Sequence, residues 1–317
     1  MKPTKIIATG ILFAQCAFGI AFGDELSDQI QITRSACSGI SNAMDNLKKM
    51  AGINTAVTAV GTVTGGVALG TGIAKAGVDS EIEQLEKQIE ELKRSNANVP
   101  VETLTIEDKA AFDKQVNEFV RTYTAELQQK ESELSAAEQK SKTLGNIRTG
   151  TLAATAVADT AGTIIAAKNK VDDDLQSRID NCVTAVKRLS TARASAQAAK
   201  TADTAEISKA NTIISACRDW EYVNLTDINK KARGAAISSG TGAALAVVGT
   251  ITSASANSST VRSGENKDKE KNLNTASNVL AGGATGASAV ATIFNATQIG
   301  AIKKAVATAD KCEEALN

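Results

Sequence analysis

Small residues recur along several stretches of this chain at alternating spacings of three and four residues. Such a period places them on one face of an α-helix, in the manner of a glycine zipper. Glycine inside a helix costs about 1 kcal/mol relative to alanine, so the helices must recover this cost by packing closely along these faces. We predict helix packing at Gly61, Gly65, Ala68, Gly72, Gly242, Ala246, Gly249, Gly283 and Gly286.

The composition favours long helices over sheets. Only two prolines occur in 317 residues, and 3% of the residues are aromatic. A globular enzyme of this length would bury many more aromatic side chains. We therefore predict an all-α fold of two tandem, long antiparallel helical hairpins, in which the small-residue rows form close-packed seams.

The hairpin prediction depends on an internal repeat. Ser35-Ala36-Cys37 and Ser215-Ala216-Cys217 each precede a small-residue stretch, a charged middle, a second small-residue stretch and a closing cysteine, Cys182 or Cys312. This order predicts a first unit over residues 24–200 and a second over 201–317. The alternative is that alanine-rich helices resemble one another through low complexity alone.

The charged middle of the first unit has a different pattern. Four apolar residues at heptad spacing lie among Glu, Lys and Gln, and they are Ile82, Leu85, Ile89 and Leu92. A turn containing Pro100 follows, and then a helix that presents Phe112, Val116, Phe119, Tyr123 and Leu127. We interpret residues 78–145 as a coiled-coil extension inserted at the tip of the first hairpin.

The N-terminus has the pattern of a signal peptide over residues 1–23. Lys2 and Lys5 precede an apolar stretch, and small residues stand before Asp24. This predicts a periplasmic or secreted protein. The alternatives are an uncleaved anchor, or lipidation at Cys16, which Gln15 disfavours.

Removal of the signal peptide leaves four cysteines, an even number that favours two disulfides over a zinc site. Each cysteine stands 36 or 39 residues from the far end of its small-residue stretch. Equal helical arms folded back on each other would pair Cys37 with Cys182 and Cys217 with Cys312. A bond between Cys182 and Cys217 is the alternative. Trp220, three residues after Cys217, is expected to pack against a disulfide.

The sequence argues against an enzyme. It contains no histidine, which excludes the commonest general base and the usual zinc and haem ligand. No phosphate-binding loop or nucleophile motif occurs, and Asp172, Asp173 and Asp174 would point in different directions on a helix. The formal net charge is +0, so no basic surplus indicates nucleic acid. We expect no catalytic residues, no cofactor and no metal.

Two function classes remain. The first is an exported helical scaffold or binding protein, whose partner is an unidentified protein or a second copy of the chain. The second is a membrane-inserting or pore-forming protein, because Ala51–Ala74, Gly234–Val261 and Asn272–Ile302 are uncharged over 24, 28 and 31 residues. Only seven strong hydrophobes occur in Ala51–Ala74, which makes spontaneous insertion marginal. From the sequence alone we favour the scaffold, with membrane association as the alternative.

Overall fold

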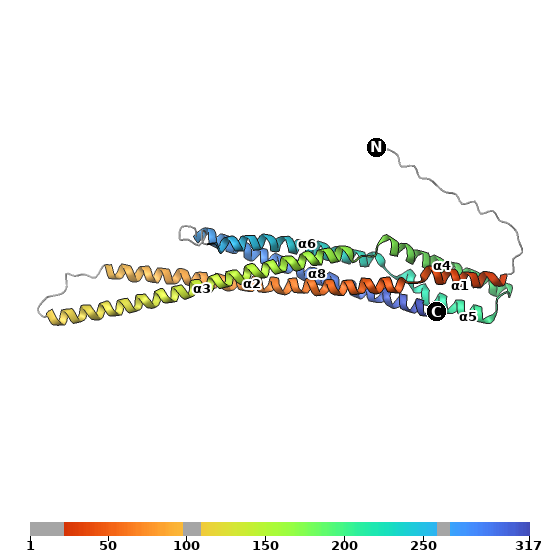
Figure 1. Cartoon of the computed structure of the whole chain (residues 1–317), viewed down its shortest axis with the longest axis horizontal. Coiled ribbons are helices and arrows are strands. Elements are labelled where there is room, and N and C mark those ends of the chain that lie inside the picture. Colours follow the sequence, from red (N-terminus) through yellow and green to blue (C-terminus); the bar gives the residue numbers. More distant parts are fainter. Residues whose placement is uncertain (1–21, 98–108, 259–266) are drawn as a thin grey trace, which may run out of the picture. The chain divides into compact units, whose positions relative to one another are not determined.

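The computed structural model describes residues 22–97, 109–258 and 267–317 (Figure 1). These residues form helices and short connections without a strand, which confirms the all-α prediction. Most of the predicted signal peptide, with Cys16, and the predicted turn at Pro100 lie outside the described residues.

Seven α-helices and one 3-10 helix make up the described chain. Their bounds are α1 Phe22–Cys37, α2 Ile40–Ala97, α3 Lys109–Lys168, α4 Asp173–Ala199, α5 Thr204–Cys217, η2 Arg218–Tyr222, α6 Leu225–Ala256 and α8 Lys267–Leu316. Side-chain caps begin two of them: Asp203 accepts from the Glu206 N–H at 2.7 Å, and Asn224 accepts from the Asp227 N–H at 2.9 Å. Gly39, with φ of +70°, separates α1 from α2, since the left-handed conformation disfavours other residues.

The residues fall into two compact units, each assembled from distant parts of the sequence. Unit 1 comprises residues 1–43, 173–223 and 305–317, and unit 2 comprises residues 44–172 and 224–304. Each unit therefore draws on both halves of the chain. The division into tandem repeats at 24–200 and 201–317 stays a prediction about internal duplication.

Unit 1 packs α1, α4, α5 and η2 with the end of α8 around an apolar core. Leu26, Ile179, Leu189 and Ile213 are at most 2% exposed in this core. Trp220 in η2 is also buried. Thr33 of α1 also bonds to α4, since its hydroxyl donates to the Ala185 carbonyl at 3.3 Å.

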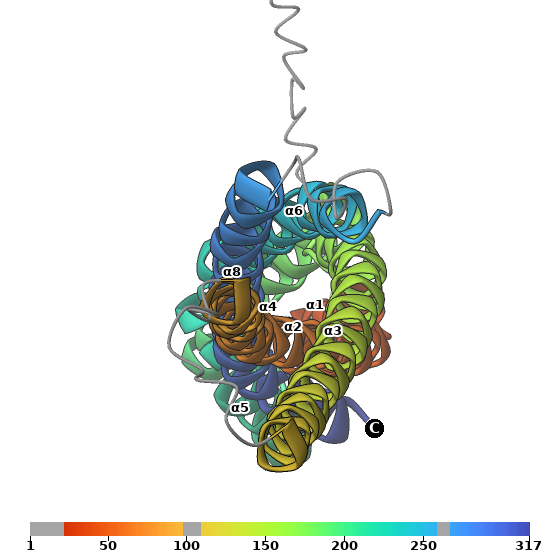
Figure 2. The ribbon, with the colours of Figure 1, turned by 90° about the vertical axis from the view of Figure 1, so that its left-hand side faces the viewer.

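Unit 2 contains an antiparallel bundle of α2, α3, α6 and α8, in which each helix runs against its two neighbours. Paired contacts establish the directions. Helix α3 contacts α2 through the pairs Gly61–Asp159 and Thr64–Thr155, and it contacts α6 through Asp159–Gly242 and Thr149–Ser253. Helix α8 contacts α6 through the pairs Gly249–Ser277 and Gly234–Phe294. It contacts α2 through Gly65–Thr285 and Gly72–Asn278. Between the two contacts of each helix pair, the residue number rises along one helix and falls along the other, so the two helices are antiparallel. Viewed end-on in Figure 2, α6 lies between α3 and α8.

Beyond the bundle, α2 and α3 continue against each other along the predicted extension. Val78, Leu85 and Ala137 are buried there, with Ile82, Leu134 and Leu144 packed around them. The assignment of this pair as a coiled coil stays a prediction.

The surface of the extension is charged and open to solvent. A hydrogen bond to Glu83 raises the pKa of Lys87, and a hydrogen bond from Gln129, followed by one from Lys130, lowers the pKa of Glu133. Both pKa shifts favour the ionised forms, because the hydrogen bonds are made to the charged groups.

Candidate functional site

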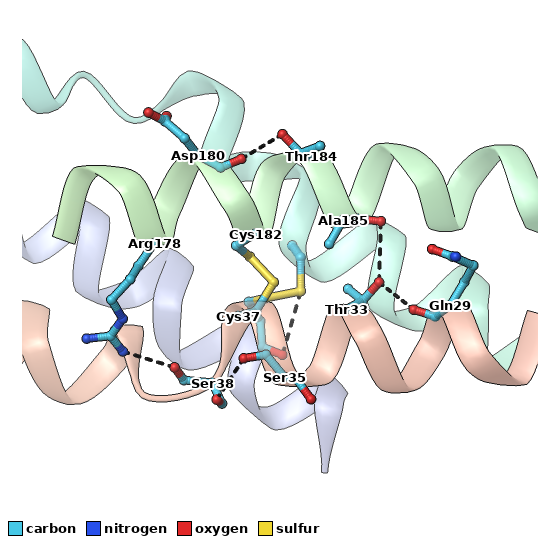
Figure 3. The surroundings of a disulfide bond; sticks show 12 residues. Gln29, Thr33, Ser35, Cys37, Ser38, Arg178, Asp180, Cys182, Thr184 and Ala185 are labelled. Atoms are coloured by element: carbon cyan, nitrogen blue, oxygen red, sulfur yellow. Dashed lines mark hydrogen bonds between the residues drawn. A yellow bond between two sulfur atoms is a disulfide. The ribbon is translucent and has the colours of Figure 1, made fainter. Parts of the chain in front are cut away.

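Cys37, Cys182, Cys217 and Cys312 lie in unit 1 as two disulfides. Figure 3 shows Cys37 and Cys182. Cys37 faces Cys182 across a Cα–Cα distance of 4.7 Å, and Cys217 faces Cys312 across 4.5 Å. These are the pairs favoured by the residue spacing. All four side chains are at most 4% exposed. Beside them, Arg178 donates to the Ser38 carbonyl at 3.1 Å.

The inside of unit 2 contains many polar side chains beside small apolar ones. We define its polar interior as the polar and charged side chains of the unit that are at most 7% exposed: Asn54, Thr58, Lys75, Ser141, Arg148, Thr155, Asp159, Asn169, Ser239, Ser253, Asn274, Ser277, Ser288, Asn295 and Gln298. Buried polar groups are costly unless they are hydrogen-bonded, so their partners decide whether such an interior is stable.

At the middle of the bundle, Asp159 stands between two glycines. Its Oδ2 atom accepts a hydrogen bond of 2.6 Å from Ser288, whereas its Oδ1 atom is buried without a partner. A Cβ atom at Gly61 or Gly242 would collide with the carboxylate, so this side chain fits only because both facing residues are glycine.

Towards the extension, two cations are fully buried. Arg148 donates to Ser253 at 3.0 Å, to Asn278 at 2.9 Å and to Asn274 at 2.7 Å. Lys75 forms ion pairs with Asp79 at 2.7 Å and Glu270 at 3.1 Å. These contacts join all four helices of the bundle.

At the opposite end, amides replace the charges. Asn54 donates to Asn295 at 2.7 Å, and Asn295 donates to Thr58 at 3.2 Å. Gln298 donates to the backbone carbonyl of Asn169 at 2.8 Å. Most of the polar interior is thus satisfied by contacts between helices.

The outside of unit 2 is apolar. We define its apolar exterior as the large hydrophobic side chains of the bundle that are at least 36% exposed: Ile53, Val60, Val63, Val67 and Ile73 on α2; Ile147, Val157 and Ile164 on α3; Ile237, Val247, Val248 and Ile251 on α6; and Val279, Val290, Ile293 and Phe294 on α8. All four helices contribute, so this surface surrounds the bundle. Single exposed hydrophobes are ordinary on a soluble protein, but an apolar surface of this extent is not.

Threonines on the same surface bond to their own helices. Their hydroxyls donate to the carbonyl four residues earlier, as in Thr64, Thr71, Thr151, Thr241, Thr252, Thr275 and Thr297. An internal bond of this kind leaves no donor in need of water.

The apolar exterior has a defined height. Along α3, Asp159 is the only charged residue between Arg148 and Lys168, a distance of roughly 30 Å at 1.5 Å per residue. The hydrocarbon core of a bilayer has a similar thickness of about 30 Å.

Four helical stretches, which include α2, α3, α6 and α8, are long and apolar enough to cross a membrane. In their most apolar windows only 28–33% of the residues are buried within the protein. The remaining residues are partly or fully exposed.

The predicted packing residues divide into two groups. Gly61, Gly65, Ala68, Gly72, Gly242, Ala246 and Gly249 are buried between helices. Gly283 and Gly286 instead lie on an exposed face of α8. The buried row of that helix is Ser277, Ala281, Ala284, Ser288 and Ala291.

Sequence reasoning did not single out Lys75, Arg148 or Asp159. The available signal was the isolation of Asp159 within an otherwise uncharged stretch of α3.

Comparisons with protein-family models, curated proteins and solved structures found no match to this chain. The candidate site therefore has to be interpreted from its own physical chemistry.

Proposed function

We propose that the chain is an exported, membrane-inserting protein whose unit 2 bundle spans a lipid bilayer. The observation that carries this proposal is the inversion of polarity in unit 2, where charged and amide side chains are buried while Val and Ile surround the outside. In water this arrangement exposes the groups that prefer burial. In lipid it places each class of side chain where it is stable, because polar residues of membrane helices face the interior and bond to one another.

The placement of the polar side chains also supports the proposal against the main objection from composition. Summing hydropathy along Ala51–Ala74 treats every Thr and the single Asn as exposed to lipid. In the bundle Asn54 and Thr58 face inward, and Thr64 and Thr71 bond to their own backbone. The lipid would instead meet Val and Ile, each of which favours the bilayer by about 0.3–0.6 kcal/mol.

A charge placed on the apolar exterior tests this proposal. Val63 is 66% exposed and Val157 is 71% exposed. In a soluble protein Val63→Arg and Val157→Arg would change stability by no more than about 0.5 kcal/mol, whereas towards the bilayer midplane each would cost about 2–4 kcal/mol. Val116→Arg, on the exposed part of α3 outside the bundle, is the matched control.

The measurement is flotation of the mature, disulfide-intact chain with phosphatidylcholine vesicles, followed by alkaline extraction. We expect the parent chain and Val116→Arg to stay with the lipid, and the Val63→Arg and Val157→Arg double variant to be lost from it. A parent chain that remains in the aqueous fraction would overturn the proposal, as would equal retention of the double variant.

Export belongs to the same proposal. Two disulfides are compatible with an oxidising compartment outside the cytoplasm, periplasmic or secreted. N-terminal sequencing of the protein recovered from its producing cells should begin at Asp24, and a chain that begins at Met1 would contradict the cleaved signal peptide.

A binding or scaffold role is the second candidate, and one segment favours it. Residues 113–122 of α3 are exposed on every face, and they present Val116, Phe119 and Val120 to solvent. The Phe119 ring lies parallel to that of Tyr123 at 6.4 Å. An aromatic cluster of this kind suits a protein partner or a second copy of the chain. Sedimentation should show a complex that Phe119→Ser removes and Thr122→Ser preserves.

A further inference from the structure

One end of the unit 2 bundle carries a surplus of positive charge. We define the basic collar as the basic residues of unit 2 at the end away from the extension: Lys48, Lys49, Lys168, Lys170, Lys230, Lys231, Arg233, Lys303 and Lys304. Every helix of the bundle contributes at least two of them, counting Lys170 with α3.

Contacts inside unit 2 bring these residues to the same level. The Val171 N–H donates to Asn229 at 2.7 Å, and Asn229 donates back to the Val171 carbonyl at 3.0 Å, which places Lys170 beside Lys230. Asn54 bonds to Asn295 and Gln298 bonds to Asn169, so α2 and α8 enter this end in register with α3.

Acidic residues do not balance the collar. Within unit 2, Asp45, Asp172 and Asp227 accompany the nine basic residues, which leaves that unit a surplus of 9 − 3 = 6 charges at this end; Asp173 and Asp174, which follow directly, belong to unit 1. Asp45 is paired with Lys48 at 3.5 Å, and Asp227 is paired with Lys231 at 2.6 Å. At the other end of the bundle, residues 75–83, 138–142 and 268–271 contain five basic and six acidic residues. The two ends therefore differ strongly in charge.

On three helices a collar residue lies one turn from an exposed isoleucine of the apolar exterior. The pairs are Lys49 with Ile53, Lys168 with Ile164, and Arg233 with Ile237. A long basic side chain next to an apolar surface can lay its methylenes against lipid while its charge reaches the headgroups. Nucleic-acid binding surfaces have no need of such an apolar neighbour.

From this juxtaposition we infer that the basic collar binds anionic phospholipid headgroups at one face of the bilayer. The inference rests on the proposed function, because it assigns the lipid class that the inserted bundle recognises. Basic residues close to an anionic membrane contribute roughly fivefold each to binding, and the contribution weakens as salt is added.

A matched pair of variants tests the inference. The collar variant combines Lys49→Gln, Lys168→Gln, Lys230→Gln and Lys303→Gln, one exposed lysine from each helix. The control variant combines Lys140→Gln, Lys142→Gln, Lys269→Gln and Lys271→Gln, four exposed lysines at the other end. Both remove the same charge from the full mature chain.

Partition is measured on phosphatidylcholine vesicles and on mixed phosphatidylcholine/phosphatidylglycerol vesicles, with a DNA duplex as a further arm. We expect the parent and control chains to prefer the mixed vesicles, and the collar variant, which loses four lysines, to lose on the order of several hundredfold in affinity for them. Retention on phosphatidylcholine should be equal for all three chains.

The three possible failures are distinct. Insertion into both vesicle types with equal affinity would overturn the collar inference while the proposed function stands. Failure to bind any vesicle would overturn both. Tight binding to the DNA duplex without a preference for phosphatidylglycerol would assign the collar to nucleic acid and so refute a lipid site.

Discussion

Single glycines decide how closely the helices of unit 2 approach, and adjacent glycines of α2 have opposite roles. Gly65 faces α8, where an added Cβ would lie 2.7 Å from the Thr285 hydroxyl and 3.3 Å from its Cα atom. Gly66 faces outward, and nothing lies within 4 Å of the same atom. Helical glycine is therefore required at the first position and only tolerated at the second.

We expect Gly65→Ala to destabilise the bundle by about 1–3 kcal/mol, because the backbone of α8 has to move. Gly66→Ala should stabilise it by up to about 1 kcal/mol, since alanine is the better helix former. Thermal unfolding of the two variants in detergent micelles, followed by circular dichroism, provides the comparison. Equal effects in the two variants would show that α2 does not pack on α8 in this register.

Asp159 is the residue whose environment conflicts most with its charge. The carboxylate receives one hydrogen bond, from Ser288, and its other oxygen is buried without a partner. We expect Asp159→Asn to raise the free energy of unfolding by about 1–3 kcal/mol, because the amide keeps the Ser288 bond and removes the buried charge. Asp113→Asn, at an exposed position of the same helix, should change it by less than about 0.5 kcal/mol. Loss of stability in Asp159→Asn would indicate that the carboxylate itself holds a ligand.

At the scale of the helix, α8 contains two rows of residues with the same period. One row runs through Gly283, Gly286 and Val290, and the other runs through Ala281, Ala284 and Ser288. Periodicity alone cannot separate them, and the preference for apolar seams favours the first row. The structure buries the second row, in which Ala281 and Ala284 pack into small apolar clusters and Ser288 bonds to Asp159.

The two rows respond differently to a larger side chain. Ala284→Leu should destabilise the bundle by about 1–3 kcal/mol, since Ala284 is fully buried. Gly286→Leu should be neutral or stabilising, because nothing lies within 4 Å of a Cβ atom at that position. Chemical unfolding of both variants in the same detergent distinguishes the rows. A larger loss in Gly286→Leu would restore the row predicted from the sequence.

Some features of the fold could be predicted from the sequence, and others could not. The low proline content and the 3–4 spacing of small residues are local properties, so they predict the all-α fold. Equal arm lengths bring Cys37 to Cys182 and Cys217 to Cys312, and the structure has both pairs at disulfide distance. The polar interior could not be predicted in the same way. The roles of Arg148 and Asp159 depend on side chains from other helices, and a composition argument assumes that apolar residues face inward.

At the scale of the molecule, the disulfides belong to unit 1 and the membrane proposal belongs to unit 2, so their stabilities can be measured separately. The Cys217–Cys312 bond closes a loop of 95 residues, and the loss of such a bond typically costs about 2–5 kcal/mol. Trp220 is the only tryptophan in the chain and is buried three residues after Cys217. It therefore reports on unit 1 alone.

We expect the Cys217→Ser, Cys312→Ser double variant to lower the urea midpoint of Trp220 fluorescence by an amount equivalent to about 2–5 kcal/mol. Ser215→Ala, at an exposed position of the same helix, should leave the midpoint unchanged. An unchanged midpoint in the double variant would mean that the bond does not support the fold of unit 1.

Lipid contact with the outside of the unit 2 bundle can be measured directly with spin labels. In the chain from Asp24 onward all four cysteines are bonded, so a nitroxide can be attached to a single cysteine introduced at Val63, Val157 or Val279, with Thr122 on the exposed part of α3 as the aqueous control. Collision rates with oxygen and with a water-soluble nickel chelate are then measured in vesicles. We predict high oxygen and low nickel accessibility at the three valine positions and the reverse at Thr122. Nickel accessibility at Val63, Val157 and Val279 equal to that at Thr122 would contradict lipid contact.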